Sequence, residues 1–94
     1  MVPVSSRVRR RLVADFGPKG EDMARRVERA IDSAPLAQLQ DRLHAAVVLA
    51  ADGTVEGFEA QLELAQLDLR DVLMNAGLEN FDYAVRTDAE FGPA

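Results

Sequence analysis

Residues 45–58 read AAVVLAADGTVEGF and contain the end of one predicted helix and the start of the next. The seven residues AAVVLAA are apolar on every side, which is typical of a helix that several neighbours enclose. Asp52 and Gly53 are turn residues that end a helix, and Thr54 is a good N-cap for the helix that follows. The stretch therefore predicts two helices joined by a short turn, which is an αα-hairpin.

Apolar residues spaced three or four apart extend the hairpin on both sides of this turn. Before the turn they begin just after Pro35, a favourable residue for the first turn of a helix. After the turn they continue as far as a stop signal, Gly77. We therefore expect an antiparallel hairpin of about residues 35–51 and 55–76. Asp68 is a good N-cap, so residues 55–76 form either one helix or two helices that break there.

Two shorter amphipathic helices are predicted before the hairpin. The first covers about residues 7–16, and Ser5 or Ser6 can cap it. The second follows Pro18 and ends before the hairpin. No stretch alternates apolar and polar residues with a period of two, so no strand is predicted. The sequence thus predicts an all-α fold, a small helical bundle built on the αα-hairpin with two shorter N-terminal helices.

The length of 94 residues fits a single helical domain, residues 1–94. We expect residues 1–5 and about 87–94 to be flexible, because the ends of a domain are often poorly ordered. Between the hairpin and the second flexible segment the chain is acidic but carries aromatic residues. We expect two of these, Phe81 and Tyr83, to dock on the bundle.

The charge of the chain is unevenly distributed, although its net value is −5. Residues 1–35 hold eight Lys or Arg against five Asp or Glu, whereas residues 36–94 hold three against eleven. The basic cluster consists of Arg7, Arg9, Arg10 and Arg11. Cations in the first turns of a helix are disfavoured by the helix dipole, so their position has another cause. The cluster either binds a polyanion or pairs with carboxylates of the acidic C-terminal two-thirds, in this chain or in a partner copy.

Reactive side chains are scarce, because the chain has no cysteine and one histidine, His44. No catalytic triad or phosphate-binding loop is recognisable. His44 is expected to be at the surface or lightly packed. Glu56, Glu59 and Glu63 share one face of a predicted helix, which we interpret as a solvated acidic face rather than a metal site. We therefore expect no enzymatic activity, no cofactor and no bound metal.

The apolar surface exceeds what the seam of a single hairpin can bury. We expect the surplus to form an interaction surface, since exposed apolar patches mark partner sites. Its predicted members are Val48, Leu49, Leu64, Leu67 and Met74. The leading expectation is a protein–protein interaction or self-association module, whose partner is a second copy of the chain or another protein. The alternative is a regulator that binds nucleic acid through the Arg7–Arg11 cluster.

The longest apolar run has seven residues, far short of the roughly 20 that span a bilayer, so we expect no membrane association. The absence of cysteine is typical of a chain that works in a reducing compartment. Arginine greatly outnumbers lysine, and alanine is abundant, which indicates a GC-rich bacterial genome. We therefore expect a bacterial cytoplasmic protein.

Overall fold

The computed structural model describes residues 3–31, 37–80 and 82–92. Within these residues the chain forms six α-helices, one short 3₁₀ turn and no strand, which confirms the predicted all-α fold. The helices are α1 (Ser6–Phe16), α2 (Gly20–Ala30), α3 (Ala37–Ala51), α4 (Val55–Leu67), α5 (Leu69–Ala76) and α6 (Tyr83–Phe91). The predicted start of the third helix at Pro35 lies outside the described residues.

Helix α1 begins and ends where the local sequence predicts. The Ser5 hydroxyl accepts a hydrogen bond from the Val8 N–H, and Gly17 ends the helix with a φ of 61°. A 3₁₀ turn, Gly17–Lys19, then leads directly into α2. Gly20 lies against the backbone of α1, because a Cβ placed on it would be 2.8 Å from Val13 Cα. The two N-terminal helices therefore pack in close contact.

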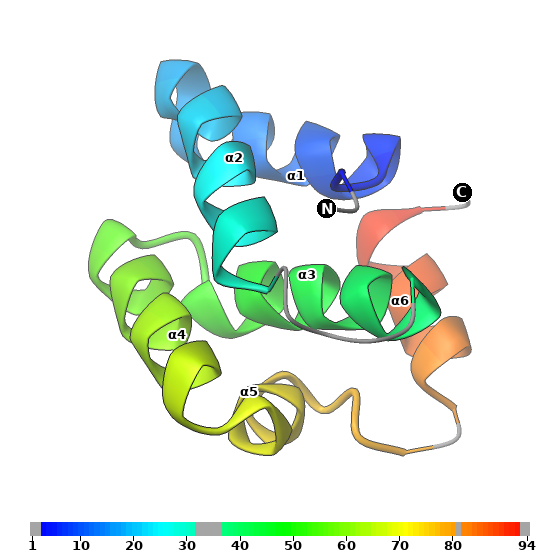
Figure 1. Cartoon of the computed structure of the whole chain (residues 1–94). Coiled ribbons are helices and arrows are strands. Elements are labelled where there is room, and N and C mark those ends of the chain that lie inside the picture. The colour runs from blue at the N-terminus through cyan, green and yellow to red at the C-terminus, as the bar shows by residue number, and fades with distance from the viewer. Residues whose placement is uncertain (1–2, 32–36, 81, 93–94) are drawn as a thin grey trace.

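Helix α3 is the centre of the fold and contacts each of the other helices of the described chain. Figure 1 shows α3 lying across the molecule, with α2 and α4 crossing its direction. Residues 45–48 and Ala51 are all buried. The apolar stretch AAVVLAA is therefore enclosed by helices of its own chain.

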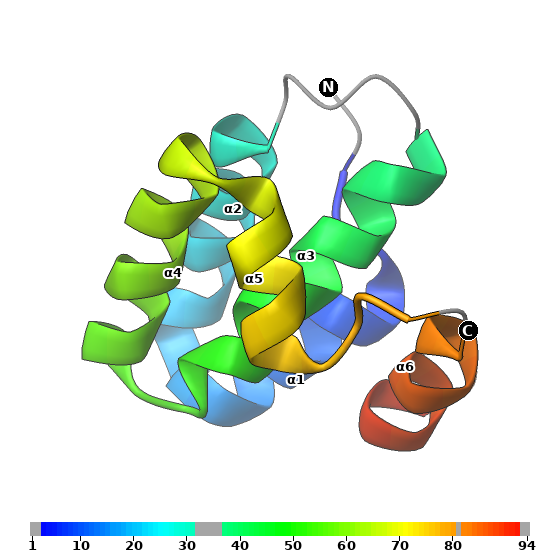
Figure 2. The ribbon, with the colours of Figure 1, turned by 90° about the horizontal axis from the view of Figure 1, so that it is seen from below.

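The segment after the turn at residues 52–54 forms two helices, α4 and α5, rather than one. This was one of the two predicted alternatives. The carboxylate of Asp68 accepts a hydrogen bond from the Arg70 N–H at 3.0 Å and caps α5. Gly77, with a φ of 72°, ends α5 in the left-handed conformation. The break allows α5 to turn back and pack against both α3 and α4 (Figure 2).

Parts of both segments that were expected to be flexible are packed against the fold. Val4 is buried, and its N–H donates a hydrogen bond to Glu28 Oε2 at 2.8 Å. At the other end, Thr87 and Phe91 of α6 are buried. Tyr83 packs partly buried against the core, as expected. Phe81, also expected to dock, lies outside the described residues, as do residues 1–2 and 93–94.

No helix in the described ranges has both the length and the apolar character needed to cross a membrane.

Candidate interaction surfaces

The five residues of the predicted interaction surface do not share one environment. Val48 is fully buried, because five helices surround α3, so its predicted place on the surface is wrong. Leu49 and Leu64 are partly buried against the core. Leu67 of α4 and Met74 of α5 remain 79% and 55% exposed. The structure therefore reduces the predicted surface to residues of the α4–α5 region.

Two arginines of the N-terminal cluster hold helix α6. The Arg7 guanidinium forms an ion pair with Asp88 and donates a hydrogen bond to the Gly92 carbonyl at 3.1 Å. Arg11 donates to the Glu90 carbonyl at 3.1 Å and lies 5.6 Å from the centre of the Phe91 ring. These carbonyls are at the negative end of the α6 dipole, where cations are favoured. The arginines are unfavourable for their own helix but stabilise the end of another.

The other two arginines of the cluster behave differently. Arg9 forms an ion pair with Glu21 and lies 3.8 Å from Glu28, both in α2. It therefore does not reach the acidic C-terminal two-thirds of the chain. Arg10 is exposed and has no hydrogen-bond or ion-pair partner within residues 3–31, 37–80 and 82–92. Three arginines of the cluster are thus paired inside the chain, and Arg10 is exposed to solvent.

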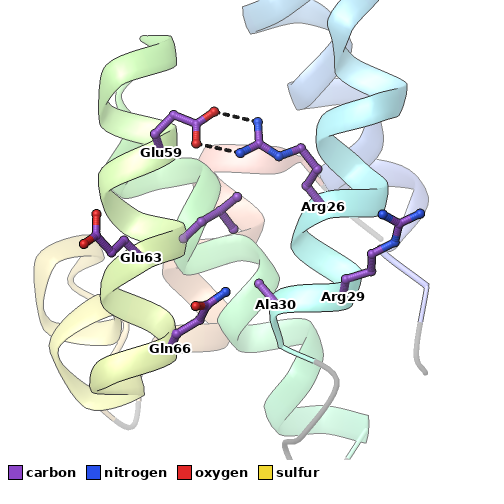
Figure 3. Close-up of a pocket in the computed structure, with 7 residues that line it drawn as sticks. Arg26, Arg29, Ala30, Glu59, Glu63 and Gln66 are labelled. Atoms are coloured by element: carbon purple, nitrogen blue, oxygen red, sulfur yellow. Dashed lines mark hydrogen bonds and ion pairs between the residues drawn. The ribbon is translucent and has the colours of Figure 1, made fainter.

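A groove of about 420 Å³ lies between α2 and α4, which run side by side in the same direction (Figure 3). Arg26 closes one end by forming two hydrogen bonds of 2.6 Å with the carboxylate of Glu59. Figure 3 shows Ala30 and Gln66 extending into the space between the helices, with Arg29 and Glu63 directed outward on the two rims. Leu62 also lines the groove. Two apolar side chains and one amide therefore lie between rims that carry opposite charges.

The Arg26–Glu59 pair shifts the protonation of both partners. The hydrogen bond from Arg26 lowers the pKa of Glu59 below 4.5, and the same bond raises the pKa of Arg26. Sequence reasoning placed Glu59 on a solvated face and missed this contact between helices. The available signal was the set of arginines beside the apolar stripe of α2 and the set of glutamates beside that of α4.

His44 is fully buried in α3, so the expectation of a surface or lightly packed histidine is wrong. Neither ring nitrogen has a hydrogen-bond partner in the part of the chain that the structure describes. Burial lowers the pKa of His44 below 6.5, and the nearby charges of Asp41 and Glu28 oppose this shift only in part. The imidazole is therefore neutral in the folded protein at neutral pH.

Acidic side chains and His44 do not converge on a metal site: the described residues contain no group of three or more His, Asp or Glu that could hold an ion. Comparisons with protein-family models, with curated proteins and with solved structures found no match for this chain. The geometry of its surfaces is therefore the basis for the functional proposal.

Proposed function

We propose that the protein is a non-enzymatic interaction module that binds a protein partner through the surface around α4. The observation that carries this proposal is the 79% exposure of Leu67 at the end of α4. An exposed leucine favours burial by a partner, since the transfer of a whole Leu side chain out of water contributes about 2 kcal/mol. Met74, 55% exposed on the adjoining helix α5, is a second exposed apolar side chain.

Two further observations support a role in binding rather than in catalysis. The single histidine, His44, is fully buried and cannot reach a substrate at the surface. The groove between α2 and α4 is lined by an ion pair, apolar side chains and an amide, none of which is a strong nucleophile. The nucleic-acid alternative loses support because Arg7, Arg9 and Arg11 have partners within the chain. As the setting for this role we propose a bacterial cytoplasm, on the composition alone.

A site-specific photo-crosslinker tests the proposal. We expect p-benzoylphenylalanine at position 67, in cells of the native organism, to form a covalent adduct with a protein after irradiation. The matched control carries the same group in place of Ala14, an exposed residue of α1. Absence of an adduct at position 67, or equal adducts at both positions, would overturn the proposed function.

A further inference from the structure

Besides the Arg26–Glu59 pair, each rim of the groove between α2 and α4 carries one unpaired charge, and the two charges are opposite in sign. Arg26 and Glu59 lie at the same height, because they are joined by two hydrogen bonds. The helices run in the same direction, so Arg29 and Glu63, one turn further along each helix, also lie at matching heights (Figure 3). Both are exposed, and neither has an ion-pair partner among the described residues. The face therefore presents one basic rim and one acidic rim in register.

Helix α4 also presents an exposed ridge. Residues Glu56, Ala60, Glu63 and Leu67 are spaced four, three and four apart, so they lie on one side of the helix. All four are exposed. Two of them are apolar, and the small Ala60 permits close approach of another backbone. A ridge of this spacing is the shape that packs into a groove between two other helices.

We propose that the groove between α2 and α4 is occupied by α4 of a second copy, with the twofold axis parallel to α4. This proposal rests on the proposed function and names the partner. A rotation about such an axis leaves heights along the helix unchanged. Glu63 of the partner subunit therefore arrives beside Arg29. Leu67 of the partner subunit, one turn further along, lies past Ala30 at the height of this copy's own Leu67. The small Ala60 of the partner subunit passes over the end closed by Arg26.

A second copy fits better than an unrelated protein because this one chain carries both complementary parts. In a twofold interface each copy supplies the same ridge and the same groove, so both Arg29–Glu63 contacts form at once. An axis perpendicular to the helices would instead set α2 on α2 and bring like charges together. With the axis parallel to α4, Asp22 approaches the partner's Glu56, and the two copies of Glu63 lie at the same height; the neighbouring Arg25 and Arg29 supply the balancing charges.

Charge reversal tests this arrangement. In Arg29→Glu both rims are acidic, and in Glu63→Arg both rims are basic, so neither variant can form favourable contacts with itself. We expect the wild type to be a dimer by multi-angle light scattering at micromolar concentration, and each variant to dimerise at least about tenfold more weakly. An equimolar mixture of the two variants has opposite charges at both contacts. We expect this mixture to form a heterodimer.

The control is Arg10→Glu, which reverses an exposed arginine outside this face and should leave the dimer intact. Circular dichroism of each variant checks that the helices are retained. A monomeric wild type, single variants that remain dimeric, or a mixture that stays monomeric would each overturn this proposal. If position 67 crosslinks to a different protein while the wild type is monomeric, the second-copy proposal is overturned and the proposed function stands.

Discussion

Arg26 of α2 and Glu59 of α4 form a bidentate ion pair, and the Arg26 guanidinium also lies 5.5 Å from the centre of the Phe58 ring. Two parallel hydrogen bonds restrict both sliding and rotation of one helix against the other. The pair therefore sets the relative height of α2 and α4 and, with it, the positions of the charged rims of the groove.

Replacing the carboxylate tests how far this pair couples stability to pH. The pKa of Glu59 is lower in the folded protein than in the unfolded chain, so the pair stabilises above pH 4.5. This contribution is lost as the pH falls through the folded value. We expect Glu59→Gln to lower the melting temperature slightly at pH 7 and to match the wild type more closely in strong acid. Glu56→Gln, at an exposed glutamate of the same helix, is the control; an equal effect at both positions would contradict the coupling.

We expect His44 to cause a second pH dependence of stability, at higher pH than that of Glu59. Its pKa is lower in the folded protein than the 6.5 of the unfolded chain, so the unfolded state binds more protons as the pH falls below 6.5. The free energy of unfolding therefore does not depend on His44 protonation well above pH 6.5, and it falls as the pH drops below this value. We expect His44→Leu to be as stable as the wild type or more stable at pH 7.5, because it removes buried nitrogens that have no partner.

The measurement for His44 is chemical denaturation between pH 7.5 and pH 5, a range in which few carboxylates titrate. The wild type should lose stability across this range, and His44→Leu should lose much less. Equal slopes in the two proteins would show that His44 does not carry the dependence.

Arg7 is expected to hold α6 in place. Its side chain is 11% exposed, and it contacts both Asp88 and the Gly92 carbonyl. Because Asp88 itself is 60% exposed, we expect Arg7→Ala to cost only about 1 kcal/mol of stability. Amide hydrogen exchange in residues 83–91 should become faster, whereas Arg10→Ala should leave it unchanged. Unaltered exchange in the Arg7 variant would refute this role.

Gly20 is expected to be indispensable for the contact between α1 and α2. A Cβ at this position would lie 2.8 Å from two backbone atoms of Val13, which cannot move independently of α1. Alanine has a higher helix propensity than glycine, which by itself would stabilise the helix by about 1 kcal/mol. Overpacking against a backbone costs more than this gain. We expect Gly20→Ala to lower the free energy of unfolding by about 1–2 kcal/mol. Thermal denaturation checks this against Lys19→Ala at the exposed neighbouring position, and a stabilised Gly20 variant would contradict it.

The all-α class, the Ser5 cap and the turn at residues 52–54 were predictable because they depend on neighbours close in the chain. Helical spacing and capping act over three or four residues, so a short window contains the whole signal. The break at Asp68 was only half predictable. The cap is visible in the sequence, but the apolar spacing continues through it. The packing of α5 against both α3 and α4 is consistent with two helices rather than one.

The environments of Val48 and His44 could not be read from the sequence. Both depend on how many helices surround α3, and α6 was not expected to reach Phe91 as a packed helix. The partners of Arg7 and Arg26 lie 81 and 33 residues away in the chain. Charge signs indicate that such pairs can form, but they do not say which carboxylate a given arginine meets.

The sequence by itself determined where the predicted helices are and which side of most of them is apolar, because both properties come from local hydrogen bonds and periodicity. Only the tertiary structure decided which apolar side chains remain in water, and it left Leu67 there while it buried Val48. The physical reason is that burial and ion pairing depend on contacts between distant segments, which form together when the helices pack around α3.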